Sequence, residues 1–99
     1  MNSYRYSSDA NADIEEISLH ILDLNPVAAH RFLDSLEATC ELLAAHPFIG
    51  RPRAELGENL RSFPVGNFLI FYTPAADDID VARVIYGGRD LPGVFGSRL

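Results

Sequence analysis

The spacing of apolar residues changes along the chain and predicts helices followed by strands. A short alternating segment at residues 4–6 favours a first strand. Apolar side chains then recur at intervals of three and four residues, which is typical of helices buried along one face. The residues concerned are Ile14, Ile17, Ile21 and Leu24 in one helix and Ala29, Phe32, Leu36, Cys40 and Leu43 in the next. The first half of the chain therefore predicts a strand and two amphipathic helices.

Capping residues mark where the two predicted helices begin and end. Ser7 or Ser8 can cap the first helix with its hydroxyl group. Asn25 can cap the second helix, and Pro26 suits its first turn because that position needs no backbone N–H. His46 and Pro47 then end the second helix. Because the link between the helices is so short, they are expected to lie antiparallel as a hairpin.

The period of the pattern then shortens to two and predicts three strands, at residues 60–64, 67–73 and 79–86. A turn containing Gly66 separates the first two, and polar residues 74–78 separate the last two. Gly87 and Gly88 end the third strand. We therefore expect an α+β fold in the order β-α-α-β-β-β, with the helical hairpin packed on a small twisted antiparallel sheet.

Length and composition limit the broad class of protein. The chain has 99 residues, of which 47% are hydrophobic, and this predicts one domain over residues 1–99. The longest apolar run, residues 68–72, is far too short to cross a bilayer, and the first residues lack the apolar stretch of a secretory signal. Cys40 is the only cysteine, so no internal disulfide, metal site or cofactor is expected. A reducing, cytoplasmic location fits these features best.

The net charge of −6 is spread unevenly. Residues 1–46 hold eight carboxylates and two arginines, whereas residues 47–99 hold six of each, and the chain has no lysine. The acidic half would repel a phosphate backbone, so no direct binding of nucleic acid is expected. Only arginines in the second half can offer cations to an anionic partner.

Several segments together resemble the ParE/RelE superfamily of toxins from bacterial type II toxin–antitoxin modules, and the ParE branch in particular. They are residues 25–26, 28–33, 36–37, 46–53, 60–72 and 83–91. Their order and spacing carry the resemblance, which covers nearly the whole chain. It implies two helices packed on a twisted antiparallel sheet. Tyr86 is a departure, because ParE-like chains often carry histidine there.

The resemblance also implies a function. A ParE-like chain is a toxin kept silent by a co-expressed, ParD-like antitoxin, in a hetero-oligomer, and its implied target is DNA gyrase. A RelE-like chain instead cleaves mRNA on the ribosome. A third alternative is a non-toxic remnant that only binds an antitoxin.

The residues themselves favour an inhibitor that binds protein over a nuclease. Cleavage of RNA needs a base, an acid and cations that stabilise the developing charge. If the chain were a nuclease, its catalytic residues would be Arg61, Arg83 and Tyr86. A tyrosine ionises far above neutral pH, no lysine is present, and all three histidines lie in the helical half. We therefore expect no catalytic group and rank gyrase inhibition above mRNA cleavage.

Six residues are candidates for binding the target or the antitoxin: Arg61, Arg83, Tyr86, Arg89, Leu91 and Phe95. Arg61 and Arg83, expected on adjacent strands, could form an exposed cationic patch. Alternatively they could pair with carboxylates of Glu55, Glu58 or Asp80. Strict alternation places Arg83 and Tyr86 on opposite faces of the sheet unless the strand bulges near Gly87, and Tyr86 could instead be a half-buried packing residue.

Overall fold

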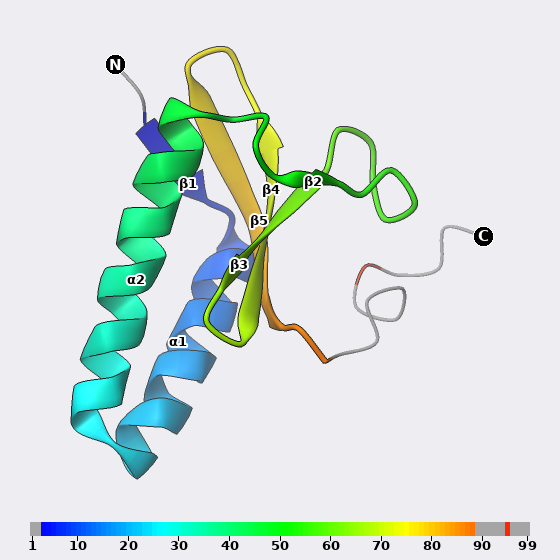
Figure 1. The fold of residues 1–99 in the computed structure, drawn as a ribbon. Coiled ribbons are helices and arrows are strands. Elements are labelled where there is room, and N and C mark those ends of the chain that lie inside the picture. Colours follow the sequence, from blue (N-terminus) through cyan, green and yellow to red (C-terminus); the bar gives the residue numbers. More distant parts are fainter. Residues whose placement is uncertain (1–2, 89–94, 96–99) are drawn as a thin grey trace.

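A helical hairpin packs on a five-stranded sheet in the computed structural model, which describes residues 3–88 and Phe95. Helices α1 (Ser8–Leu24) and α2 (Pro26–Ala45) lie side by side along one face of the sheet (Figure 1). The strands are β1 (Ser3–Tyr6), β2 (Arg51–Pro52), β3 (Arg61–Val65), β4 (Phe68–Pro74) and β5 (Asp78–Tyr86). Their order across the sheet is β1-β5-β4-β3-β2. The predicted α+β class is confirmed.

The helix boundaries follow from the capping residues that the sequence predicted. The Ser7 hydroxyl accepts a hydrogen bond from the Ala10 amide at 3.0 Å and caps α1. The Asn25 side chain accepts hydrogen bonds from the first amides of α2, at 3.0 Å from Val27 and 3.3 Å from Ala28. Asn25 thus closes one helix and opens the next, which turns the chain back on itself within one residue.

The sheet differs from the expected one at both edges. Strands β3, β4 and β5 form the predicted antiparallel meander and β2 pairs antiparallel with β3, but β1 pairs with β5 in parallel. A parallel partner requires a long crossover connection, and the helical hairpin is the first part of it. The additional strand, β2, has only two residues, too few to produce an alternating pattern in the sequence. The sheet is therefore mixed and has five strands instead of four.

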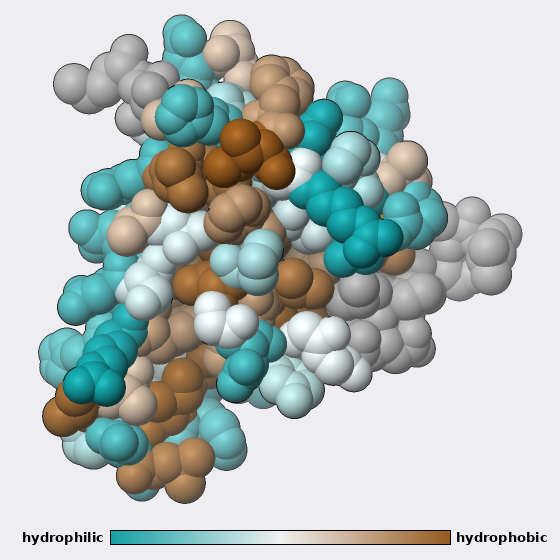
Figure 2. All heavy atoms as spheres, viewed as in Figure 1, coloured by the Kyte–Doolittle hydropathy of each residue, from teal (hydrophilic) through white to brown (hydrophobic). Residues whose placement is uncertain are grey.

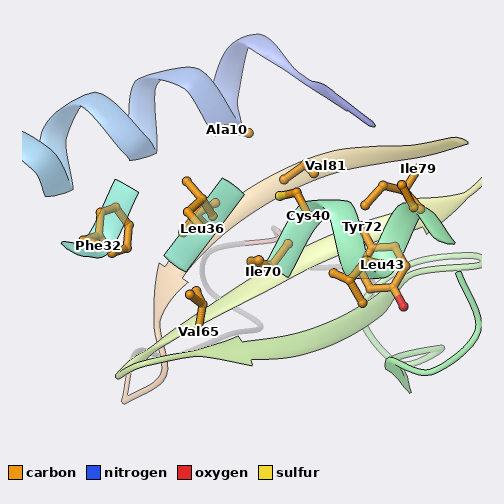
Figure 3. Close-up of a cluster of buried hydrophobic side chains, with 12 residues drawn as sticks. Ala10, Phe32, Leu36, Cys40, Leu43, Val65, Ile70, Tyr72, Ile79 and Val81 are labelled. Atoms are coloured by element: carbon orange, nitrogen blue, oxygen red, sulfur yellow. The ribbon is translucent and has the colours of Figure 1, made fainter. Parts of the chain in front are cut away.

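Buried side chains lie on both faces of the sheet. The larger cluster, between sheet and helices, includes Phe32, Leu36 and Cys40 of α2 pointing toward Ile70 and Val81 of the strands (Figure 3). On the other face a smaller cluster joins Leu56, Leu60, Phe71 and Ile85. Cys40 is fully buried, as expected for a small apolar residue in the helical stripe.

A bulge in β5 decides which way its last residues point. Tyr72 pairs with Val81 and the preceding Phe71 pairs with Arg83, so Ala82 is the extra residue. Val81 and Val84 both reach the helix-side cluster because the bulge shifts the alternation by one position. Arg83 consequently falls on the same side as Ile85, away from that cluster.

Candidate functional site

Arg83 is held by a carboxylate of the first helix. Its Nε donates to Oδ2 of Asp13 at 2.7 Å, and its Nη2 donates to Oδ1 at 2.9 Å. The two side chains are 23% and 13% exposed, so the pair is largely shielded from water. The hydrogen bonds to Asp13 are the main cause that raises the pKa of Arg83, against the opposing effect of burial. Arg83 is therefore a fixed, permanently charged group.

The same carboxylate also binds the part of β5 that extends past the end of β1. Oδ2 of Asp13 also accepts a hydrogen bond from the Val84 amide at 3.0 Å. Two residues earlier in β5, the Ala82 carbonyl accepts a hydrogen bond from the Ser7 hydroxyl at 2.8 Å. The start of α1 thus satisfies strand groups that no neighbouring strand reaches.

Tyr86 lies on the opposite face of β5 from Arg83. The pairing of β4 and β5 is regular from Phe71–Arg83 to Phe68–Tyr86, so alternation is unbroken between the two residues. The Tyr86 ring is 55% exposed and meets the edge of Phe68, with 6.1 Å between ring centroids. Phe68 in turn packs on Phe32 of α2 at 5.2 Å. Tyr86 is therefore an exposed ring on a rigid support.

A shallow groove of about 190 Å³ runs beside Tyr86, between α1 and the end of β5. Its floor is apolar and its rim carries Asp13, Glu16, His20 and the Tyr86 ring. The lining residues are Asp13, Glu16, Ile17, His20, Ile21, Phe68, Val84, Ile85 and Tyr86. An exposed tyrosine above an apolar floor is typical of a surface that binds another protein.

Arg61 of β3 binds the segment between α2 and β2. Its Nη1 donates to the carbonyl groups of Phe48 at 3.1 Å and Gly50 at 2.7 Å. Its guanidinium lies over the Phe48 ring, 5.2 Å from the centroid. These contacts tie β3 to the segment that leaves α2.

Tyr72 holds the same segment from within the core. Its hydroxyl donates to the Pro47 carbonyl at 2.8 Å and accepts from the Gly50 amide at 3.0 Å. Burial raises the pKa of Tyr72, while the Gly50 hydrogen bond and the charge of Arg61 act in the opposite direction. The phenol stays protonated and bridges two backbone groups.

Neither Arg61 nor Arg83 forms the ion pairs that were the alternative to an exposed patch. They lie on β3 and β5, which β4 separates, so the expectation of adjacent strands is wrong. Glu55 instead contacts Arg53 at 3.7 Å, and Asp80 contacts Arg5 at 2.9 Å. Arg83 pairs instead with Asp13 of α1.

The three residues proposed for a nuclease do not come together. Arg61 pairs with Tyr72, and Tyr86 pairs with Phe68 four positions away along β4, a separation of roughly 13 Å. Arg83 lies on the other face of β5 from Tyr86. The three side chains therefore do not converge on one point of the sheet.

The remaining candidates lie toward the end of the chain. Phe95 packs on Phe71, with 4.7 Å between ring centroids, and covers part of the far face of the sheet. Arg89 and Leu91 lie outside the described residues.

Among residues 3–88 and Phe95, no group of three or more histidine, cysteine or acidic side chains is placed to hold a metal ion. No helix in this part of the chain has the length and hydrophobicity required to cross a membrane.

A helical hairpin packed on a mixed five-stranded sheet defines a small α+β protein. The family model for the ParE toxin of the type II toxin–antitoxin system, parDE, matches residues 4–91. The chain belongs to this family of toxins, and membership implies an antitoxin partner.

Individual relatives agree with this assignment. Toxin ParE1 of Caulobacter vibrioides is 30% identical over 87 residues, covering 87% of this chain and 90% of that protein. Toxin ParE3 of the same organism is 26% identical over 89 residues, covering 89% of each chain. The fold is similar to a chain of the chromosomal ParDE system from P. aeruginosa, with a TM-score of 0.71 and 19% identity. That match covers 87% of this chain and 96% of the other.

The position of Asp13 in the sequence already indicates a partly buried carboxylate. It is three residues after Ala10 and four before Ile17, and therefore lies next to the apolar stripe of α1. A carboxylate in such a position needs a partner, because burying a lone charge is costly. Arg83, in a predicted strand of the same sheet, was one of the available cations.

Proposed function

We propose that this toxin acts in the cytoplasm by binding DNA gyrase and that a ParD-like antitoxin neutralises it in a hetero-oligomer. It performs no chemistry of its own and does not bind nucleic acid directly. The observation that supports this proposal is the separation of Arg61, Arg83 and Tyr86. An enzyme that cleaves RNA would hold such groups around one phosphate.

Each of the three residues has another role that fits a binding protein. Arg61 and Arg83 are held by groups of this chain, at the Gly50 carbonyl and the Asp13 carboxylate, and stabilise the fold. Tyr86 is exposed beside an apolar groove, where a partner can bury it. Buried aromatic side chains supply much of the binding energy at protein interfaces. We therefore assign Tyr86 and its groove to target binding.

Two assays in parallel test the proposed target. In the first, the purified chain is added to gyrase with relaxed plasmid and ATP, and supercoiling and DNA breaks are followed. In the second, it is added to translating ribosomes, and the mRNA is examined for cuts. The proposal predicts inhibition of gyrase and intact mRNA. Cleaved mRNA with unaffected gyrase would establish the nuclease alternative, and no effect in either assay would leave a non-toxic remnant.

Neutralisation is tested separately in cells. Expression of the chain alone should arrest growth, and co-expression with the antitoxin encoded beside it should restore growth. The two proteins should then purify as one complex at micromolar concentration. Growth arrest that the neighbouring protein does not relieve would contradict the proposed pairing, whatever the gyrase assay shows.

A further inference from the structure

A pocket of about 580 Å³ lies around the Arg61 side chain, at the end of the sheet away from Tyr86. We call it the Arg61 pocket. It lies between the link from α2 to β2, the loop before β3 and the turn after β4. Figure 1 shows the link and the turn at the same end of the molecule. The pocket walls include Phe48, Pro52, Leu60 and Pro74, and its polar side chains include Asn59 and Arg61.

Arg61 brings a positive charge to this pocket without a carboxylate beside it. Carboxylate oxygens lie 2.9, 3.7 and 2.7 Å from the guanidinium nitrogens of three other arginines, which are Arg5, Arg53 and Arg83. Within residues 3–88 and Phe95, no carboxylate oxygen comes within 4.0 Å of Arg61. Arg61 is nonetheless partly buried, so water solvates its charge incompletely. A partly buried cation of this kind favours an anionic partner from outside the chain.

The guanidinium of Arg61 is already oriented for such a partner. Its hydrogen bonds to the described residues both come from Nη1, which donates to the Phe48 and Gly50 carbonyls. Nε and Nη2 are the remaining nitrogens, and two parallel N–H groups match the geometry of a carboxylate. Because the carbonyl groups and the Phe48 ring hold the side chain in place, binding would cost little further ordering of Arg61.

Apolar surface surrounds this cation. The Phe48 ring is 69% exposed, and its centroid lies 5.2 Å from the Arg61 guanidinium. Pro52 pairs with Arg61 across β2 and β3, which places both side chains on one face of the sheet. Figure 2 shows hydrophobic side chains directly beside hydrophilic ones where the chain passes from α2 to β2. An exposed aromatic ring stacked with an arginine is typical of the residues that contribute most to protein interfaces.

The charges around the pocket limit what can occupy it. Glu58 and Asp77 are exposed and adjoin the lining residues Asn59 and Ala76. A run of acidic residues or a nucleic-acid backbone would be repelled by these carboxylates and by the net charge of −6. A single carboxylate with an apolar neighbour instead complements both Arg61 and the pocket walls.

We propose that the Arg61 pocket binds an extended segment of a protein partner in which one carboxylate side chain stands next to an aromatic or aliphatic side chain. The carboxylate accepts hydrogen bonds from Nε and Nη2 of Arg61. The apolar neighbour packs on Phe48 and Pro52. Occupation of this pocket does not depend on whether gyrase is the target.

Peptide titration of the intact, ¹⁵N-labelled chain tests this proposal by NMR. The probe is a peptide of about eight residues, too short to form a stable helix alone, with phenylalanine next to glutamate at its centre and serine and glycine elsewhere. One comparison peptide has glutamine in place of glutamate, and the other has serine in place of phenylalanine. The probe should bind about tenfold more tightly than either, with affinity falling as salt rises. The amide resonances that shift should belong to residues 48–54, 59–61 and 74–76.

A pair of apolar variants locates the binding surface. Phe48→Ser should weaken binding of the probe about tenfold, and the ring is exposed, so the core is left intact. Ile49→Ser is the matched control, because Ile49 is 49% exposed and does not line the pocket. It should bind the probe as the parent chain does.

A pair of arginine variants tests the charge. Arg61→Gln should remove the preference for glutamate over glutamine, whereas Arg51→Gln should keep it. Arg51 is exposed and pairs with Ser62, next along β3, so its side chain lies on the other face of the sheet. Circular dichroism checks that Arg61→Gln is folded, and the Phe48 comparison stands without that variant.

Four results would overturn the proposal. Equal binding by the glutamine peptide would mean that the cation selects nothing. Shifts confined to other residues, or none at millimolar peptide, would mean that the pocket takes no such segment. Displacement of the probe by an equal concentration of inorganic phosphate would make it a site for any anion. Sedimentation that shows a dimer of the parent chain, and a monomer of Phe48→Ser, would make a second copy the occupant.

Discussion

The carboxylate of Asp13 on α1 receives three hydrogen bonds from β5, two from the Arg83 guanidinium and one from the Val84 amide. The partners are about 70 positions apart in sequence. One side chain therefore joins the helical hairpin to the edge of the sheet, satisfies an edge amide and neutralises a cation that water reaches poorly. Its removal leaves two groups without a partner at once.

We expect Asp13→Ala to lower the free energy of unfolding by about 2–4 kcal/mol, because Arg83 and the Val84 amide both lose their acceptor. Urea denaturation followed by circular dichroism measures this loss. Glu15→Ala on the exposed side of the same helix is the control and should change stability by less than about 0.5 kcal/mol. Equal losses for both variants would show that the ion pair has no special role.

Gly50→Ala should destabilise the chain by about 2 kcal/mol or more, because a Cβ at this position would overlap the Tyr72 ring. The displaced ring would also lose its hydrogen bonds to Pro47 and Gly50. Gly57→Ala is the control, since a Cβ there meets Leu60 at an ordinary contact distance of 3.4 Å. Thermal unfolding of both variants checks this prediction, which a stable Gly50→Ala variant would contradict.

Alkaline pH should weaken the fold through Cys40. Burial is the main cause that raises the pKa of the Cys40 thiol, from 9.0 to about 11. Between these values the folded chain holds a proton that the unfolded chain has lost, so stability is complete below pH 9 and falls as pH rises. Burial raises the pKa of the neighbouring Tyr6 as well, which acts in the same direction.

The contribution of the thiol is measured by comparison with Cys40→Ala. From pH 9 to pH 11, the unfolding free energy of the parent should fall by about 2 kcal/mol more than that of the variant. Urea titrations at four or five pH values give both curves. Parallel curves would mean that the thiol ionises alike in the folded and unfolded chains.

Tyr86→Ser should reduce gyrase inhibition at least about tenfold while it changes stability by less than about 1 kcal/mol. The ring is exposed, so its loss opens no cavity in the core. Phe48→Ser removes another exposed aromatic ring, at the other end of the sheet, and should leave inhibition unchanged. Loss of inhibition in the Phe48 variant alone would move the target surface to the Arg61 end.

The helices and most strands were predictable from the sequence, because their signals are local. Asn25 followed by Pro26 defines a helix start from side-chain chemistry alone, and the structure has it there. The continuous apolar run of β4 likewise indicates a central strand that is covered on both faces, and its middle residues are buried. Such patterns need no knowledge of distant partners.

The candidate site was less predictable because it depends on non-local pairing. The bulge at Ala82 arises where β5 leaves its pairing with β1 and meets the start of α1, and no local pattern marks it. The bulge sets the direction of Arg83 and hence its pairing with Asp13. For Arg61 the sequence left open an exposed patch or a cross-strand ion pair, but its partners are backbone carbonyls that the sequence does not display.

The position of β1 beside β5 also constrains how a nascent chain acquires this structure. Ser3 pairs with Asp78, so the first strand stays unmatched until nearly all of the described fold has been synthesised. The hairpin can form early, since its contacts are local, but the sheet closes only when the last strand arrives. A copy whose translation stops before β5 therefore lacks both the Asp13–Arg83 pair and the Tyr86 surface.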